Sequence, residues 1–187
     1  MNLHFDLLAS SYDRLIAPPD PARLRTLLRL PIAGWLLDVG GGTGRVAALL
    51  QAQVDHLVIC DLSAPMLQQA SAKGVACPVQ AHVGRLPFPN DFFDRVLVVD
   101  ALHHFSHQPA AIAELVCVLS LGGRLVIEEP DIDRLPVKLV ALGEKLALMG
   151  SHFSAPEEIA AMAAGHGGRV AVDRDGQFSA WITFDKA

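Results

Sequence analysis

Short apolar runs alternate with amphipathic segments along most of this chain. The runs with the length of strands are 35–39, 56–60, 75–80, 95–99 and 124–127. Segments with helical spacing of their apolar residues lie between them, at 46–53, 63–73 and 108–119. Run 95–99 is continuous and rich in β-branched residues, as expected of a strand that is buried on both faces. The alternation predicts an α/β fold with a doubly wound, mostly parallel sheet.

The two ends of the chain have different patterns. Residues 3–16 have helical spacing, and prolines then separate them from a second predicted helix at 21–30. Near the carboxyl end, Asp175-Gly176 lies between β-like runs 169–173 and 178–184, which predicts an antiparallel hairpin. We therefore expect a single domain over 1–187 with a seven-stranded sheet. Within it, 1–30 would be N-terminal helices and 131–165 a helical lid segment.

Composition narrows the protein class. The chain has 187 residues, of which 51% are hydrophobic and 19% charged, enough for one domain with a substantial core. The net charge of −5, without a basic run, disfavours nucleic acid as a partner. No apolar run has membrane-spanning length. Cys60, Cys77 and Cys117 lack metal-ligand spacing, so we expect buried free thiols at Cys60 and Cys117 and a cytoplasmic location.

A glycine-rich loop follows the first predicted strand. Asp38 is followed at alternate positions by Gly40, Gly42 and Gly44. The dinucleotide-binding pattern Gly-x-Gly-x-x-Gly fails from Gly40, because Arg45 stands at the third glycine position. It fits from Gly42 only as the variant ending in Ala47, well past the strand. The loop as a whole resembles the first motif of class I S-adenosylmethionine (SAM)-dependent methyltransferases, an acidic residue followed by three alternate glycines.

Charge distinguishes the two cofactor classes. A pyrophosphate favours a helix N-terminus, whereas SAM carries a sulfonium and an ammonium besides its carboxylate. Asp38 suits such a ligand, although it could instead cap the next helix. Asp61 ends the second predicted strand, where a carboxylate can accept hydrogen bonds from ribose hydroxyls, or can cap the following helix. Leu62 and Met66 could form an apolar wall against adenine, or pack helix against sheet.

Further segments resemble the branch of this family related to ubiquinone and menaquinone biosynthesis methyltransferases. These segments are Gly84–Pro89 before Phe93-Asp94, Ala101–Phe105, Leu121–Leu125, and Phe5-Asp6 with Tyr12-Asp13. The resemblance implies that SAM contacts Tyr12, Asp38, Gly40, Gly41, Gly42, Gly44, Asp61, Leu62, Met66, His82, Val83, Val99 and Asp100. His82 stands where the family usually has an acidic residue for the adenine amino group. A neutral imidazole nitrogen can accept the same bond, but a protonated one cannot. Val83 could also supply a backbone amide.

Two histidines are the best candidates for catalysis. His103 and His104 follow the fourth predicted strand, at the edge of the sheet where doubly wound folds bind ligands. Either could act as a general base or a substrate anchor, or could merely hold a loop. Asp100 could bind the methionine ammonium or the substrate, or cap a helix. Glu128, Glu129, Asp131 and Asp133 match no metal motif, so we expect solvated loop charges and no metal.

These observations predict an enzyme that transfers a methyl group from SAM to a small, apolar or aromatic acceptor, releasing S-adenosylhomocysteine. The apolar segment 135–153 could close over the acceptor, or could be core or dimer packing. We expect a monomer or homodimer without a membrane span. One alternative is a SAM-binding regulatory or assembly module without turnover. The other is a nicotinamide-dependent oxidoreductase that uses Gly42, Gly44 and Ala47.

Overall fold

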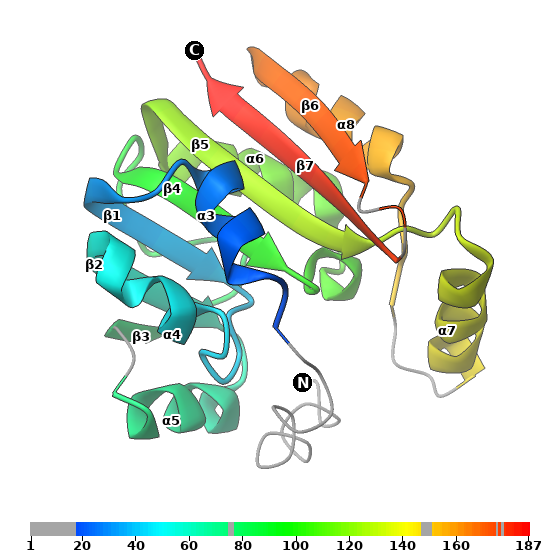
Figure 1. The fold of residues 1–187 in the computed structure, drawn as a ribbon, viewed down its shortest axis with the longest axis horizontal. Helices are drawn as coiled ribbons and strands as arrows, with labels where there is room; N and C mark the ends of the chain where they lie inside the picture. Colours follow the sequence, from blue (N-terminus) through cyan, green and yellow to red (C-terminus); the bar gives the residue numbers. More distant parts are fainter. Residues whose placement is uncertain (1–17, 75–76, 147–150, 175, 177) are drawn as a thin grey trace.

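The computed structural model describes residues 18–74, 77–146, 151–174, 176 and 178–187 (Figure 1). A seven-stranded sheet with the order β3-β2-β1-β4-β5-β7-β6 forms its centre. The strands are β1 (Ile32–Val39), β2 (Val54–Asp61), β3 (Cys77–Gln80), β4 (Phe93–Val99), β5 (Leu119–Pro130), β6 (Gly168–Arg174) and β7 (Ser179–Lys186). The first five strands pair in parallel, while β7 runs antiparallel to both β5 and β6. The predicted mixed sheet with a C-terminal hairpin is confirmed.

Helices cover both faces of the sheet (Figure 1). They are α3 (Pro21–Leu28), α4 (Ala47–Leu50), α5 (Ala64–Ala72), α6 (Gln108–Val118), α7 (Leu135–Leu146) and α8 (Pro156–Ala164). One buried apolar cluster joins α3, α4 and α5 to the sheet, and a second joins α6 and α8 to its other face. Helix α7 lies away from the sheet (Figure 1). This layering leaves the carboxyl ends of β1, β2 and β4 as an edge where loops meet.

Local sequence signals explain several element ends. The Oγ of Ser63 accepts a hydrogen bond from the backbone N–H of Met66 over 3.3 Å, and Pro65 lies in the first turn of α5. This is the predicted N-cap. Asp20 caps α3 in the same way, accepting from the N–H of Ala22 over 2.9 Å. These caps fix where the two helices leave the loops that precede them.

Some predicted boundaries were wrong. Strand β5 begins at Leu119 and runs through Gly122 and Gly123 to Pro130, rather than covering only 124–127. The two glycines lie where the register with β4 shifts, between the paired residues Leu119 and Arg124, and Gly122 has a φ of +74°, so they form an irregularity within the strand rather than its end. Within 46–53, only Ala47–Leu50 is α-helical, and Gln51–Gln53 form a 3₁₀ turn. The predicted helix at 3–16 lies outside the described residues.

The cysteines differ from one another in burial. Cys60 is buried in β2, as predicted. Cys117 is only half-buried, and its thiol contacts the Oδ1 of Asn90 at 3.1 Å, so its predicted full burial was wrong. Every helix in the described ranges is too short or too polar to cross a bilayer.

Candidate functional site

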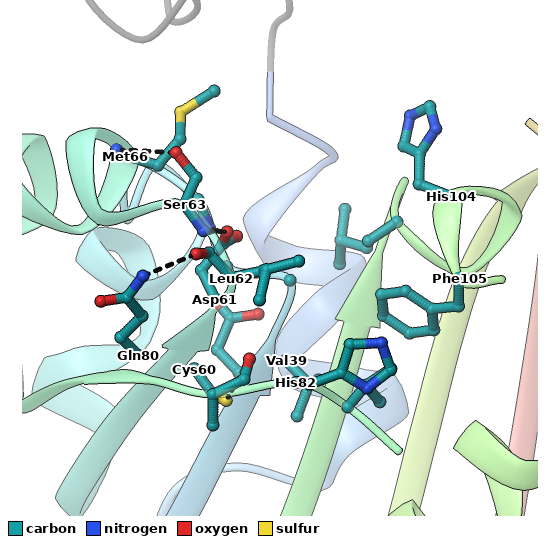
Figure 2. A pocket seen from close by; sticks show the side chains of 18 of the residues that line it. Val39, Cys60, Asp61, Leu62, Ser63, Met66, Gln80, His82, His104 and Phe105 are labelled. Carbon is teal, nitrogen blue, oxygen red and sulfur yellow. Dashed lines mark hydrogen bonds between the residues drawn. The ribbon is translucent and has the colours of Figure 1, made fainter. Parts of the chain in front are cut away.

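A cavity of about 730 Å³ opens at the carboxyl ends of β1, β2 and β4. Most of the predicted cofactor residues line it: Asp38, Gly40, Gly41, Gly42, Asp61, Leu62, Met66, His82, Val83, Val99 and Asp100. Figure 2 shows Met66, Ser63 and Asp61 on one side of it and His104 and Phe105 on the other. The structure therefore brings together residues that are up to 68 positions apart in sequence, from Asp38 to Ser106. Tyr12 lies outside the described residues.

The glycine loop has a backbone conformation that disfavours side chains. Gly40, Gly42 and Gly44 have φ angles of +72°, +53° and +74°, in the left-handed region. A Cβ on Gly40 would lie 2.6 Å from the Cβ of Ala101, whereas one on Gly42 would meet no protein atom within 3.8 Å. Gly42 therefore leaves open a space that belongs to the cavity. Gly44 does not line the cavity, and a Cβ on it would lie 3.1 Å from atoms of Ile59 and Ala70.

Asp61 ties the loop to the second strand. Its Oδ2 accepts a hydrogen bond from the N–H of Gly42 over 2.9 Å, and its Oδ1 accepts one from the N–H of Ser63 over 2.8 Å. The N–H of Gly40 also donates to the carbonyl of Cys60 over 2.7 Å. A carboxylate fixed in this way has a defined orientation in the wall of the cavity. Helix capping is left to Ser63 (Figure 2).

Asp38 is buried beneath the loop. It is 1% exposed, and its Oδ2 has no hydrogen-bond partner. Burial raises the pKa of Asp38 to about 7; nearby Arg45 opposes this shift and Asp61 adds to it. It does not cap the next helix, whose N-cap is Val46. A buried carboxylate oxygen without a partner is costly, so its position suggests that the site takes a ligand with positive charge.

Arg45 and Asp100 both line the cavity and form an ion pair, with Nη2 of Arg45 3.8 Å from Oδ2 of Asp100. Asp100 has a φ of +53°, which a non-glycine residue rarely adopts. Such local strain is often found at functional sites. Glu128, beside them, is 7% exposed, and burial raises the pKa of its carboxyl to about 7. Nothing in the local sequence marks Arg45 as a site residue, although it directly follows Gly44.

The side of the cavity predicted to hold adenine combines apolar and polar groups. Met66 and Val83 are buried, and Leu62 is 48% exposed. The amide of Gln80 donates to the carbonyl of Leu62 over 3.0 Å (Figure 2). The Nδ1 of exposed His82 accepts a hydrogen bond from the N–H of Gly84 over 3.0 Å. The neutral ring of His82 therefore has its hydrogen on Nε2, which makes that atom a donor rather than the predicted acceptor.

The two candidate catalytic histidines have different environments. His104 lines the cavity, and its Nδ1 lies 3.1 Å from the Oγ of Ser151. Burial, with a smaller effect of His103, lowers the pKa of His104 to about 3. His103 does not line the cavity: it is 3% exposed, and its Nδ1 lies 2.6 Å from Oε2 of Glu129. His104 thus remains a candidate for substrate contact, whereas His103 holds the loop.

The acidic residues near the end of β5 are not all solvated, contrary to the prediction. Glu128, Glu129 and Asp131 are buried, and only Asp133 is exposed. They are buried because β5 continues to Pro130 between β4 and β7. Within the described part of the chain, no group of three or more His, Cys, Asp or Glu residues could hold a metal ion.

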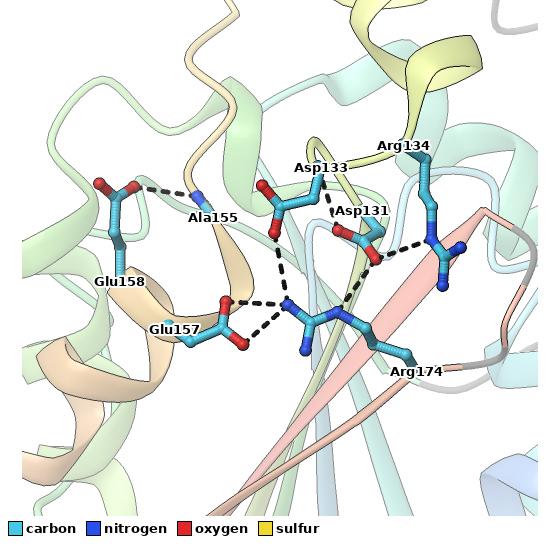
Figure 3. Close-up of polar contacts among 7 residues, drawn as sticks. All are labelled: Asp131, Asp133, Arg134, Ala155, Glu157, Glu158 and Arg174. Carbon is cyan, nitrogen blue, oxygen red and sulfur yellow. Dashed lines mark hydrogen bonds and ion pairs between the residues drawn. The ribbon is translucent and has the colours of Figure 1, made fainter.

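Arg174 at the end of β6 links several of these acids (Figure 3). Its Nε lies 3.1 Å from Oδ2 of Asp131, and its Nη2 lies 2.7 Å from Oε1 of Glu157 and 3.4 Å from Oδ2 of Asp133. Arg134 contacts the same Asp131 oxygen at 3.4 Å. This network fastens the start of α8 and the chain after β5 to the C-terminal hairpin.

The fold and the position of the cavity define a Rossmann-like methyltransferase architecture. Residues 37–127 match the family described as the methyltransferase domain. The resemblance to class I SAM-dependent methyltransferases is therefore confirmed. The match does not favour the alternative interpretation as a nicotinamide-dependent oxidoreductase.

Relatives of known name agree with this assignment. The ubiquinone/menaquinone biosynthesis C-methyltransferase UbiE of Stutzerimonas stutzeri is 36% identical over 104 residues, which cover 50% of this chain and 41% of that protein. The protein of the same name from Pseudomonas putida is 38% identical, with the same coverage. The match thus spans less than half the length of these relatives.

Solved structures show the same fold at low sequence identity. A SAM-dependent methyltransferase from Thermotoga maritima superposes with a TM-score of 0.82 and 19% identity, covering 100% of both chains. The complex of DhpI with S-adenosylhomocysteine (SAH) gives a TM-score of 0.77 and 20% identity, covering 99% of this chain and 94% of that one.

Proposed function

We propose that this protein binds SAM in the cavity at the carboxyl ends of β1, β2 and β4 and transfers its methyl group to a small acceptor. The open space over Gly42, between the Asp61 carboxylate and the buried Asp38, carries this proposal. The family of residues 37–127 and the SAH complex of a structural neighbour support it. SAH is the product that the same cavity would release.

The donor groups of the cavity fit the parts of SAM. Asp61 suits the ribose hydroxyls, because its carboxylate is held in place by Gly42 and Ser63. Leu62, Met66 and Val83 suit the adenine ring, whose nitrogen acceptors would meet the Nε2–H of His82. Gly40, Gly41, Val99 and Asp100 line the region between the glycine loop and β4, with the buried carboxylate of Asp38 below it. The carboxylates of Asp38 and Asp100 suit the ammonium and the sulfonium of SAM.

Methyl transfer from SAM needs little from the protein beyond the correct positioning of SAM and the acceptor. SAM supplies an electrophilic methyl group when bound. The chain's own residues orient the acceptor in line with that group and exclude water. A histidine whose pKa is about 3 is a poor proton acceptor at neutral pH. His104 therefore serves better as a hydrogen-bonding anchor for the acceptor than as a general base.

The acceptor itself is proposed as a small molecule with an apolar or aromatic part. Phe105 lines the cavity beside His104 and gives this side an apolar surface. The relatives in S. stutzeri and P. putida are named for C-methylation in quinone biosynthesis, which supports a carbon atom as the methyl acceptor. Of the predicted lid segment 131–165, α8 packs with α6 against the sheet, so only the part that precedes α8 is proposed to lie over the acceptor side.

SAH binding measured by calorimetry tests the cofactor site. We expect micromolar affinity for the unaltered protein and at least a ~10-fold loss for Gly42→Ala, whose new methyl group would occupy ligand space. Gly167→Ala is the matched control, since Gly167 also has a positive φ, +76°, and open space around it, but lies before β6. Equal affinity in the two variants would contradict the site.

Turnover separates an enzyme from the alternative, a SAM-binding module. The protein is incubated with SAM and a panel of small phenols, quinols and amines, and products heavier by one methyl group are sought by mass spectrometry. Methylated product confirms the enzyme. SAH binding without any methylated product favours the regulatory or assembly module.

A further inference from the structure

The carboxylate of Glu129 is enclosed by the loop that follows β4. Its Oε1 accepts hydrogen bonds from the N–H groups of Ala101 over 2.9 Å and Leu102 over 2.6 Å, and its Oε2 accepts one from the N–H of His103 over 3.3 Å. Three successive backbone N–H groups that converge on one anion form a nest. Here the anion is a side chain of the protein itself, and it is 4% exposed.

The same carboxylate also orients an imidazole. The Nδ1 of His103 donates to Oε2 of Glu129 over 2.6 Å, so Glu129 fixes both the backbone of the loop and the ring that projects from it. The His103 ring also stacks on the ring of Phe153, with a centroid distance of 4.4 Å and an interplanar angle of 14°. A buried ring with a fixed hydrogen bond and a stacked partner has little freedom to rotate.

The loop is further joined to the segment after α7. The N–H of His152 donates to the carbonyl of His103 over 2.7 Å. The side-chain amide of Gln108 donates to the carbonyls of Leu102 over 3.2 Å and His152 over 2.6 Å, and its Oε1 accepts from the hydroxyl of Ser154 over 2.8 Å. These contacts hold Leu102 and His103, the two residues before His104, in place.

His104 then follows directly and faces the cavity. Its ring centroid lies 3.9 Å from that of His103, and its Nδ1 lies 3.1 Å from the Oγ of Ser151. Any movement of the loop at 101–103 would therefore move His104 relative to the cavity. Glu129 contacts the residues beside His104 in two ways, through the loop backbone and through the ring of His103.

We propose that Glu129 is a positioning residue whose carboxylate, through the Ala101–His103 backbone and the His103 imidazole, keeps the His104 ring directed into the acceptor side of the cavity. Glu129 itself is not among the residues that line the cavity, so it does not touch the ligand. The role of His104 toward an acceptor rests on the proposed function. The control of His104 by Glu129 does not.

The replacement Glu129→Gln tests this role with almost no change in size. A glutamine has one acceptor oxygen and turns an NH₂ group toward backbone donors, so the nest loses its anion. Histidine-ring NMR then reports on His104 without any acceptor or cofactor. In the unaltered protein, burial keeps the pKa of His104 at about 3, so its ring signals should stay constant from about pH 5 to about pH 8. In Glu129→Gln we expect the ring to become solvated and to titrate in that range.

Glu157→Gln is the matched control, since Glu157 is an exposed carboxylate that pairs with Arg174 and lies outside the loop. It should leave the His104 signals unchanged. SAH affinity should stay within about 3-fold in Glu129→Gln, because the Gly42 and Asp61 contacts remain. With an acceptor identified, kcat should fall at least ~10-fold, and Glu129→Asp should restore part of it.

Unchanged His104 signals in a folded Glu129→Gln variant overturn the proposal. Should that variant fail to fold, His103→Gln decides in the same way: constant His104 signals overturn the proposal, and titrating signals support it. Failure of the proposed function would be seen separately, as absence of SAH binding in the unaltered protein, and it would leave the NMR result valid.

Discussion

The N–H of Gly42 donates a hydrogen bond to Oδ2 of Asp61 over 2.9 Å, across 19 positions of sequence. The other oxygen of Asp61 accepts from the N–H of Ser63, so one carboxylate holds the loop after β1 and the start of α5. The loop conformation therefore depends on a residue in the next strand. The same residue is proposed to bind ribose.

Asp61→Asn should weaken both the loop and the ligand site. An amide has one oxygen, so either Gly42 or Ser63 loses its acceptor and faces an NH₂ group. We expect a loss of about 1 kcal/mol in the free energy of unfolding and at least a ~10-fold loss of SAH affinity. Urea unfolding and calorimetry measure the two quantities. Asp20→Ala removes the N-cap of α3 at a similar stability cost but away from the cavity, and it should bind SAH normally.

Asp38→Asn should stabilise the empty protein at alkaline pH. The carboxyl has a pKa of about 7 when folded and 3.8 as its ordinary value, so the folded state binds the proton more tightly. The stability contributed by protonated Asp38 is therefore present below about pH 4 and is lost as pH rises toward about 7. Relative to the unaltered protein, Asp38→Asn should gain on the order of 2 kcal/mol between pH 5 and pH 8 by urea unfolding.

The same change should reduce cofactor binding. The charged form of Asp38 suits a cationic ligand, so SAM affinity of the unaltered protein should rise from about pH 6 to about pH 8 while that of Asp38→Asn stays flat. A variant that gains no stability at high pH, or binds SAM with the original pH dependence, would contradict this role of the buried carboxylate.

His82 should support SAH binding through its own loop. The Nδ1 of His82 accepts a hydrogen bond from the N–H of Gly84, and His82→Phe leaves that N–H without this acceptor. We expect a severalfold loss of SAH affinity in His82→Phe, measured by calorimetry. His82→Asn keeps an oxygen acceptor for Gly84 and should retain more of the affinity. Equal affinity of His82→Phe and the unaltered protein would exclude this role of His82.

Arg174→Gln should destabilise the protein more than Arg134→Gln. Both arginines contact Asp131, which is 1% exposed, but Arg174 also pairs with Glu157 and Asp133 (Figure 3). Loss of Arg174 leaves the buried carboxylate of Asp131 with the more distant Arg134 and the N–H of Asp133 as partners, for an expected cost of about 1–3 kcal/mol. Loss of the more exposed Arg134 should cost less than about 1 kcal/mol. Thermal or urea unfolding of both variants gives the comparison, and a larger cost for Arg134→Gln would refute it.

The sequence pattern correctly predicted those elements of the fold that depend on residues close together in the chain. The apolar runs indicated the parallel strands, Ser63 and Pro65 marked the start of α5, and Asp175-Gly176 indicated the hairpin. The alternate spacing of Asp38 and the glycines located the cavity, because the backbone must turn at that point for any ligand to approach.

Long-range contacts account for what the sequence did not show. Glu129 looked like a loop charge, because only the pairing of β5 with β4 and β7 places it against the loop at 101–103. His103 and His104 are neighbours of the same type, and nothing local separates the buried ring from the one that faces the cavity. The contact of Arg45 with Asp100 is visible only in the structure, where the end of β4 places Asp100 3.8 Å from Arg45.

The strand order also has a consequence for how the chain folds. Among the strands that the structure describes, β6 pairs with β7 alone, which follows it in the chain and lies between it and β5. During synthesis β6 leaves the ribosome first, yet it has no neighbour in the sheet until β7 has been added. Helix α8 packs mainly on these two strands, so the region that carries Glu157 should acquire its final form late in folding, after the cofactor edge of the sheet is complete.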